Sequence, residues 1–410
     1  MKILHVSTLS SGGAFNAAYR LHEGLLETGF DSTFLTLKEN QFSGGINFPA
    51  FGKYGLSLNK RLLNKVGIQS LKSAERARAY KNLGADIEAF SSPNTDYQLG
   101  KYIIDHIKPD IINLHWCANF IDYEEFFGSL NLPVVWTLHD EQPFSAYWHY
   151  SNDRLDSKKA KEIEVDYLEI KNRAIEDFEN KLTIVAPSQW LLDQSKSSPL
   201  FQSHPHKLIR YGLNANVFKP TKELPKSFSH EQIDPEKIKL LFICQSVSNP
   251  RKGMGTLLDA LSQLNPANYQ LIAVGEVSPE IQKDLTLDTV FTGSISDPLE
   301  LAKVYNYCDA MVIPSKQDNL PNTMLESLAC GTPVIGTPAG GISEILKNPI
   351  FGILSETHDA VDLAKAIRSF SAESFERKVI AELAHQIFDL EKQAKEYTTV
   401  YNNLLEDKKV

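Results

Sequence analysis

Cysteine is scarce in this sequence of 410 residues, and no two of its four cysteines stand close together. Cys117, Cys244, Cys308 and Cys330 therefore predict neither a zinc motif nor a disulfide framework, which favours a reducing compartment. The sequence also lacks a His-Glu-x-x-His motif, an Asp-x-Asp after a strand and a Cys/His cluster. These absences predict that the protein binds no metal.

Long apolar runs and an excess of positive charge are missing too. No apolar run approaches the roughly 20 residues of a membrane span, and the N-terminus enters a strand-like run at once, so we expect no signal peptide. The formal net charge of −9 argues against a nucleic-acid partner. We expect a cytoplasmic protein. It would be either free in the cytoplasm or peripheral at the inner face of the cell membrane.

The length is too great for one compact core and predicts two domains. Short apolar runs alternate with amphipathic segments, which is typical of α/β folds with parallel sheets. The expected strands are residues 2–7, 33–37, 111–115, 134–138, 183–186 and 207–211, and then 239–244, 269–274, 290–291, 310–313, 334–335 and 352–354. The expected helices are 14–28, 97–107, 163–180, 189–195, 256–264, 299–307, 323–329 and 360–370.

Proline-punctuated residues 214–236 predict the seam between the domains. We expect Rossmann-like domains at 1–215 and 216–385. The chain after residue 373 reads as strongly helical, and residues 386–410 are expected to form a helix that crosses back to the first domain.

Residues 41–93 fit the alternation poorly and predict an irregular basic insertion. Between Lys53 and Lys81 there are eight basic residues and one acidic residue, Glu75. One interpretation is a solvated helix whose apolar stripe packs on its own domain. The other is a basic amphipathic element that faces anionic lipid or a phosphate-bearing acceptor.

Residues 314–336 are the most informative stretch. They predict a strand end, a polar loop, a short helix, a turn and the next strand. Asp318 and Glu326 bracket the loop and the first turns of the helix, and Pro321 suits its first turn. The amides around Asn322 and Thr323 would attract a diphosphate, while the two carboxylates would accept hydrogen bonds from hydroxyls. This combination suits a nucleotide-sugar.

Two further loops carry features of phosphate binding. Gly12 and Gly13 follow the first strand and open a helix, so the backbone there could approach a ligand closely, although taken alone they are better explained by a simple tight turn. Arg251 and Lys252 stand before Gly253 and a helix, where a cation beside helix amides would favour a pyrophosphate. The alternative for these two cations is an ordinary surface loop.

His139 and Asp140 follow the strand at 134–138, where loops of a parallel sheet line a ligand crevice. His139 could donate or accept a hydrogen bond at neutral pH, or be structural. His115 and Trp116 end the neighbouring strand. The aromatic residues that include Tyr147 and Trp148 would either pack on the core or present a platform to a sugar.

These segments, in this order, resemble family 4 of the retaining, metal-independent glycosyltransferases with the GT-B fold. The resemblance covers nearly the whole chain and is strongest over 244–337 and 137–144. The run Trp136-Thr-Leu-His-Asp-Glu-Gln-Pro-Phe144 is similar to a branch from bacterial capsule, exopolysaccharide and colanic-acid clusters. The fold implied is two Rossmann-like domains that face each other across a cleft.

The resemblance implies a role for each matching residue. Asp318 would contact the transferred sugar, Glu326 the ribose, Lys252 the diphosphate, and His139 the donor sugar at the reaction centre. Most family members have Glu where Asp318 stands, and the family often has an Arg where Gln245-Ser246 stands. The implied donor-binding residues are Gly12, Gly13, Arg251, Lys252, Gly293, Asp318, Asn319, Leu320, Pro321, Asn322, Thr323 and Glu326. The candidate acceptor-binding residues are His115, Trp116, Asp140, Tyr147 and Trp148.

The function predicted is transfer of a sugar from a nucleotide diphosphate sugar to a hydroxyl of a glycan or lipid-linked oligosaccharide in surface polysaccharide biosynthesis, with no cofactor and no metal. Two alternatives stay open. One is a nucleotide-sugar epimerase with the GT-B fold, and the other is a non-enzymatic nucleotide-sugar-binding partner of a polysaccharide assembly.

Overall fold

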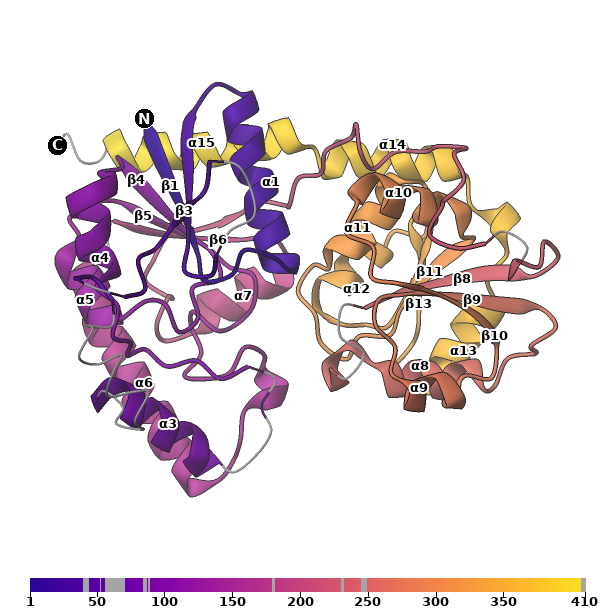
Figure 1. Ribbon diagram of the computed structural model, residues 1–410, viewed down its shortest axis with the longest axis horizontal. Coiled ribbons are helices and arrows are strands. Elements are labelled where there is room, and N and C mark those ends of the chain that lie inside the picture. The colour runs from indigo at the N-terminus through magenta and orange to yellow at the C-terminus, as the bar shows by residue number, and fades with distance from the viewer. Residues whose placement is uncertain are drawn as a thin grey trace. The chain divides into compact units, whose positions relative to one another are not determined.

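The computed structural model describes residues 1–39, 44–51, 53–55, 71–83, 87, 89–178, 181–229, 232–244 and 249–406 (Figure 1). The chain divides into two compact units. The first unit is Met1–Ile209 together with Glu391–Val410, and the second is Arg210–Leu390. Gln245 and Ser246, like residues 56–70 of the basic insertion, lie outside the described residues.

The first unit contains a seven-stranded parallel sheet in the order β3-β2-β1-β4-β5-β6-β7. Its central strands are buried along almost their whole length, as expected of a parallel sheet covered on both faces. The strands are β1 (Lys2–Ser7), β2 (Asp31–Thr36), β3 (Ile46–Asn47), β4 (Ile111–Leu114), β5 (Val134–Thr137), β6 (Leu182–Ala186) and β7 (His206–Leu208).

The first unit also contains helices. They are α1 (Gly13–Glu27), α3 (Leu71–Leu83), α4 (Leu99–Tyr102), α5 (Tyr123–Ser129), α6 (Lys158–Ile175), α7 (Gln189–Ser197) and α15 (Leu390–Glu406). The last helix comes from the far end of the sequence and buries Ala394, Tyr397, Val400 and Tyr401 in one apolar cluster with residues of α1, β1 and β5.

The second unit contains a six-stranded parallel sheet in the order β10-β9-β8-β11-β12-β13. Its strands are β8 (Ile238–Ile243), β9 (Tyr269–Val274), β10 (Asp288–Gly293), β11 (Ala310–Ile313), β12 (Val334–Gly336) and β13 (Gly352–Leu354). Its helices are α8 (Met254–Leu261), α9 (Pro279–Asp284), α10 (Pro298–Tyr307), α11 (Asn322–Ala329), α12 (Gly340–Leu346), α13 (Ala360–Arg368) and α14 (Arg377–Ile387).

The predicted α/β class and the parallel strands are confirmed, with strand ends within a few residues of expectation. The predicted helix at 97–107 is instead α4 followed by a π-helical turn, Ile103–Ile107, that ends at Lys108 in the left-handed conformation. The helical run after residue 373 is interrupted between α14 and α15, where Leu213 donates its amide hydrogen to the carbonyl of Phe388 at 2.8 Å.

Candidate active site

A short turn, Pro250–Lys252, comes before α8 and lies against the loop that follows β11. Gly253 ends the turn with a φ of 75°, and a Cβ there would meet the carbonyl oxygen of Pro314 at 1.8 Å. Only glycine accepts both the left-handed backbone and this close approach. Gly253 thereby allows Lys252 to reach the loop after β11.

Asp318, in that loop, lies between two cations. Its carboxylate accepts a hydrogen bond from Lys252 Nζ at 2.6 Å, and Arg251 lies 3.6 Å from its other oxygen. Arg251 also donates to the carbonyl of Gln317 at 2.9 Å. The structure therefore brings together three predicted site residues, of which Lys252 and Asp318 stand 66 positions apart in the sequence.

Burial by itself would raise the pKa of Asp318, but Lys252 and Arg251 outweigh it and hold the pKa below its usual value. The carboxylate is thus ionised at neutral pH. The Lys252 side chain stays one-third exposed while that of Asp318 is 8% exposed, so the cation is the more accessible partner of the pair.

The loop leads into α11, whose N-terminus follows Pro321 and has no side-chain cap. Asn319 and Leu320 are buried, and the carbonyl of Asn319 accepts the amide hydrogen of Gly341 at 2.7 Å. This bond fixes the loop against the start of α12. The first amides of α11, at Asn322 and Thr323, belong to a helix N-terminus that favours an anion.

Glu326 is buried further along α11, and its carboxylate accepts a hydrogen bond from the Tyr305 hydroxyl at 2.9 Å. Tyr305 is fully buried on α10. Sequence reasoning missed Tyr305, because no local pattern shows which residue of one helix will meet a carboxylate of another.

Gly293 ends β10 with a φ of 69°, and its carbonyl accepts the amide hydrogen of Gly275 at 2.9 Å. A Cβ on Gly275 would meet the carbonyl oxygen of Cys244 at 1.9 Å, so glycine is required there as well. Sequence reasoning missed Gly275, although a glycine directly after an apolar strand was an available signal.

In the first unit, four of the predicted residues meet at the ends of β4 and β5. His139 Nε2 lies 3.1 Å from His115 Nδ1, and Trp116 donates to Asp140 at 2.9 Å. Asp140 also hydrogen-bonds to His149 Nδ1 at 2.7 Å. Burial lowers the pKa of His139 to about 4, against the opposing charge of Asp140, so its ring is neutral at pH 7.

Gly12 and Gly13 lie at the start of α1, directly after the loop that follows β1. Gly12 has a φ of 92° and no side chain caps the helix. The same loop is joined to the end of β4, because Thr8 donates its amide hydrogen to the carbonyl of Trp116 at 2.8 Å. The Gly12 turn and Trp116 therefore lie at one edge of the first sheet.

Tyr147 and Trp148 belong to an apolar cluster with Leu83 of α3 and Tyr167 of α6. Tyr147 is fully buried and its hydroxyl accepts the amide hydrogen of Leu155 at 3.1 Å. This environment favours the packing interpretation over the sugar platform for both residues.

Lys171 was not anticipated. It is fully buried on α6 and donates to the carbonyls of Gln142 at 2.9 Å and Ser145 at 2.7 Å. It thus holds the loop that begins at His139 and Asp140. Burial lowers the pKa of Lys171 to about 7.

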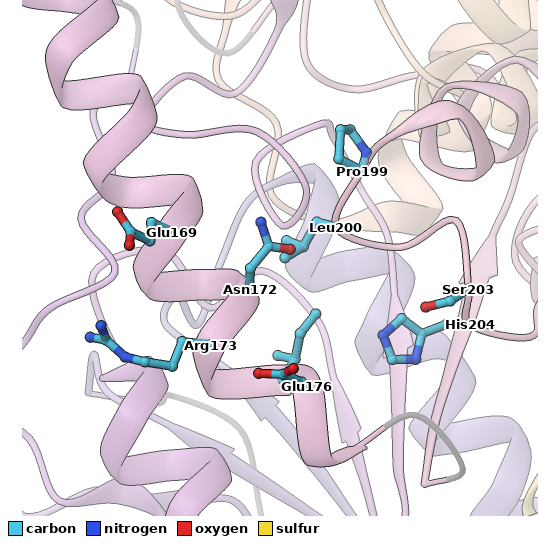
Figure 2. Close-up of a pocket in the computed structure, with 9 residues that line it drawn as sticks. Glu169, Asn172, Arg173, Glu176, Pro199, Leu200, Ser203 and His204 are labelled. Carbon is cyan, nitrogen blue, oxygen red and sulfur yellow. The ribbon is translucent and has the colours of Figure 1, made fainter.

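A cavity of about 520 Å³ in the first unit is lined by none of the residues described above (Figure 2). Figure 2 shows Glu169, Asn172 and Arg173 of α6 on one side and Ser203 and His204 on the other. No predicted site residue lines it.

Among the described residues, no group of three His, Cys, Asp or Glu side chains is arranged to hold a metal ion. The helices in the described part of the chain include none that is both long and apolar enough to span a membrane.

Residues 237–373 match the family model for glycosyl transferases group 1. A curated relative, D-inositol 3-phosphate glycosyltransferase of Streptosporangium roseum, is 24% identical over 295 residues, which cover 67% of this chain and 62% of the relative. The match thus spans less than two thirds of that relative's length.

Two solved structures match almost the whole chain. Sucrose-phosphate synthase from Thermosynechococcus elongatus gives a TM-score of 0.69 at 18% identity and covers 99% of this chain and 100% of its own. Anabaena Alr3699/HepE in complex with UDP-glucose gives 0.62 at 16% identity and covers 98% and 100%. The chain has the GT-B fold, and part of its second unit matches the group 1 glycosyltransferase model.

Proposed function

We propose that this protein is a metal-independent, retaining glycosyltransferase. It moves a sugar from a nucleotide diphosphate sugar to a hydroxyl of a glycan or lipid-linked acceptor. The observation that carries the proposal is the cluster of Lys252, Arg251 and Asp318 beside the N-terminus of α11. It combines cations and helix amides, which suit a diphosphate, with an ionised carboxylate, which suits sugar hydroxyls.

In this mechanism the bond between the anomeric carbon and the diphosphate oxygen breaks, and the acceptor hydroxyl oxygen bonds to that carbon on the same face. The departing phosphate oxygen takes the hydroxyl proton. Lys252 and the amides of Asn322 and Thr323 stabilise the negative charge that develops on the leaving group. Asp318 holds hydroxyls of the transferred sugar. No side-chain nucleophile is required, because the acceptor oxygen itself bonds to the anomeric carbon.

The remaining predicted residues take their roles around that donor. Glu326 holds the ribose, and the backbone at Gly293 meets the nucleobase. Gly12 and Gly13 approach the diphosphate, and His139 contacts the donor sugar. Arg251 already reaches the Asp318 loop and supplies the phosphate contact for which relatives use an Arg at the position of Gln245-Ser246.

The acceptor side is assigned to Trp116 and Asp140, with His115 behind them. Trp116 is half-buried at the edge of the first sheet, and its ring can present a face to a sugar. The similarity of residues 136–144 to capsule and exopolysaccharide enzymes supports a surface polysaccharide as the product. UDP-sugars are the first donors to test, because one structural relative was solved with UDP-glucose.

The test is incubation with UDP-, GDP- and ADP-sugars, with and without a panel of glycan and lipid-linked acceptors. We expect one donor to raise the melting temperature, and transfer to occur only with acceptor and with retained anomeric configuration, in the presence of a chelator. Conversion of the donor without acceptor would indicate the epimerase instead. Binding of the donor without turnover would indicate the non-enzymatic partner. In that case the biological role of the protein should survive the double substitution Asp318→Ala with Glu326→Ala.

A further inference from the structure

Three histidines from three neighbouring strands form a hydrogen-bonded chain inside the first unit. His5 lies in β1, His115 directly follows β4, and His139 comes just after β5. His5 Nδ1 lies 2.9 Å from His115 Nε2, and His115 Nδ1 lies 3.1 Å from His139 Nε2. All three rings are buried.

The two hydrogen bonds must run in the same direction. Burial lowers the pKa of His5 and His115 well below the usual value and that of His139 to about 4, so all three rings are neutral at pH 7. A neutral imidazole has one N–H donor and one acceptor nitrogen. Because His115 uses both nitrogens in the chain, it donates through one and accepts through the other.

The His5 end of the chain decides which direction this is, and the charge near His139 agrees with it. At one end, His5 Nε2 is buried and has no hydrogen-bond partner among the described residues. If His5 donates through Nδ1, Nε2 holds only a lone pair; in the opposite direction, Nε2 would hold a buried N–H donor, which is rarely left unpaired. At the other end, the ionised Asp140 places a negative charge beside His139. This charge favours the direction in which the N–H bonds point from His5 toward His139, because their positive ends then face it.

We propose that His5 and His115 are positioning residues that hold the proton of His139 on Nδ1, through a hydrogen-bond chain running from His5 to His115 to His139. The functional consequence rests on the proposed glycosyltransferase activity. His139 then carries its proton on Nδ1, and its Nε2 lone pair is occupied by His115. A neutral ring in this state does not act as a base, which agrees with a mechanism in which the departing phosphate takes the proton.

The test is the tautomer of His139, read from nitrogen–proton NMR correlations of the full chain labelled with [¹⁵N]histidine. We expect Nδ1 of His139 to carry the proton in the unmodified protein. His115→Phe keeps a ring of similar size but removes both nitrogens of the middle residue, so His139 should become a mixture of tautomers. His22→Phe is the control. The centroids of the His22 and His5 rings lie 5.8 Å apart, but His22 hydrogen-bonds to Ser32 and is not part of the histidine chain.

A proton on Nε2 of His139 in the unmodified protein would overturn the proposal, and so would an unchanged tautomer in folded His115→Phe. If His115→Phe does not fold, His5→Phe serves, because it removes the donor that sets the direction. In turnover assays we expect His115→Phe to lower kcat about tenfold with little change in the donor KM. If no donor is turned over, the glycosyltransferase proposal fails, while the NMR result still decides the histidine chain on its own.

Discussion

The ion pair between Lys252 and Asp318 orders the Lys252 side chain before a ligand binds. A lysine in an ordinary surface loop loses considerable side-chain entropy when it orders against a ligand. Here the carboxylate of Asp318 already holds the ammonium at 2.6 Å, beside the N-terminus of α11. The Lys252 ammonium is therefore already in position when a diphosphate binds. Asp318 would then give up part of its contact with Lys252 and accept hydrogen bonds from sugar hydroxyls.

Lys252→Ala should slow turnover by about 2–3 kcal/mol, or roughly 30- to 150-fold, because one charge-assisted contact to the leaving diphosphate is lost. The measurement is kcat/KM with the donor that raises the melting temperature in the nucleotide-sugar screen. The matched control is Lys316→Ala, since Lys316 has an exposed side chain in the neighbouring loop and should leave turnover within about twofold. Equal effects of the two substitutions would remove Lys252 from the site.

Glu141, next to Asp140, gives a prediction about pH. Burial raises the pKa of Glu141 from 4.5 to about 7, so the folded chain holds this proton more tightly than the unfolded chain. Between those two values the folded state binds more protons, and the free energy of unfolding falls as pH rises. The full decline amounts to about 3 kcal/mol.

Glu141→Gln has no such proton to lose. Its free energy of unfolding should therefore fall less than that of the unmodified protein between pH 4 and pH 8, by up to about 3 kcal/mol. Urea denaturation at the two pH values measures this difference. Parallel pH profiles of the two proteins would show that Glu141 is ionised in the fold.

At the scale of elements, the turn 250–252 depends on the backbone of Gly253. Gly253→Ala would place a Cβ 1.8 Å from the Pro314 carbonyl oxygen in a left-handed conformation. We expect a loss of at least about 2 kcal/mol of stability, together with weaker donor binding, because Lys252 is displaced. Gly255→Ala is the control: no atom lies within 4 Å of its added Cβ, and it should be neutral or stabilising by up to about 1 kcal/mol. Similar melting temperatures for the two variants would contradict this account.

Helix α3 carries four of the eight basic residues of the basic insertion, Lys72, Arg76, Arg78 and Lys81. Leu83 and Ala79 pack into the cluster that holds Tyr147 and Tyr167, whereas residues 56–70, which carry most of the apolar stripe, lie outside the described residues. Arg78 and Lys81 remain exposed on the same helix, so packing and contact with anionic lipid are compatible.

If α3 meets a membrane, binding to vesicles that contain phosphatidylglycerol should weaken sharply as salt is raised from 50 to about 500 mM. Arg78→Glu with Lys81→Glu should weaken it further. Lys207→Glu, an exposed substitution on β7 of the same unit, is the control for charge alone. Binding that responds to neither salt nor the α3 substitutions would leave only the packing role.

Strands and side-chain partners differed in how far the sequence could predict them. Runs such as 310–313 and 269–274 are apolar throughout, because both faces of a parallel sheet are covered, and their bounds were predicted without error. Helix α12 begins at Gly340-Gly341 and is seven residues long, so its propensity is low and it was missed. The family resemblance predicted that Asp318 and Lys252 bind one donor, but it did not predict the ion pair between them. The contacts of Glu326 with Tyr305, and of Lys171 with the loop after Asp140, depend on tertiary packing that no local pattern encodes.

For the molecule as a whole, the first unit depends on the last helix of the chain. The Tyr397 hydroxyl hydrogen-bonds to Thr137 of β5 at 2.9 Å, and Asn113 of β4 donates to the Tyr401 hydroxyl at 2.7 Å. Both strands lead directly into the residues that carry His115 and His139. Helix α15 thus completes the core beneath the histidine chain.

Removal of residues 391–410 should therefore unfold the first unit and leave the second folded. Each of the two buried tyrosines is worth about 3–5 kcal/mol, which together approach the whole stability of an ordinary domain. Hydrogen exchange measured by mass spectrometry should show that peptides from β1, β4 and β5 lose protection, while those from β11 and α11 keep it. Thr399→Ala in the full-length chain, an exposed change on the same helix, should leave every peptide protected. Retained protection of β1 in the truncated chain would mean that the first sheet is stable without α15, and that its contacts with Thr137 and Asn113 are dispensable.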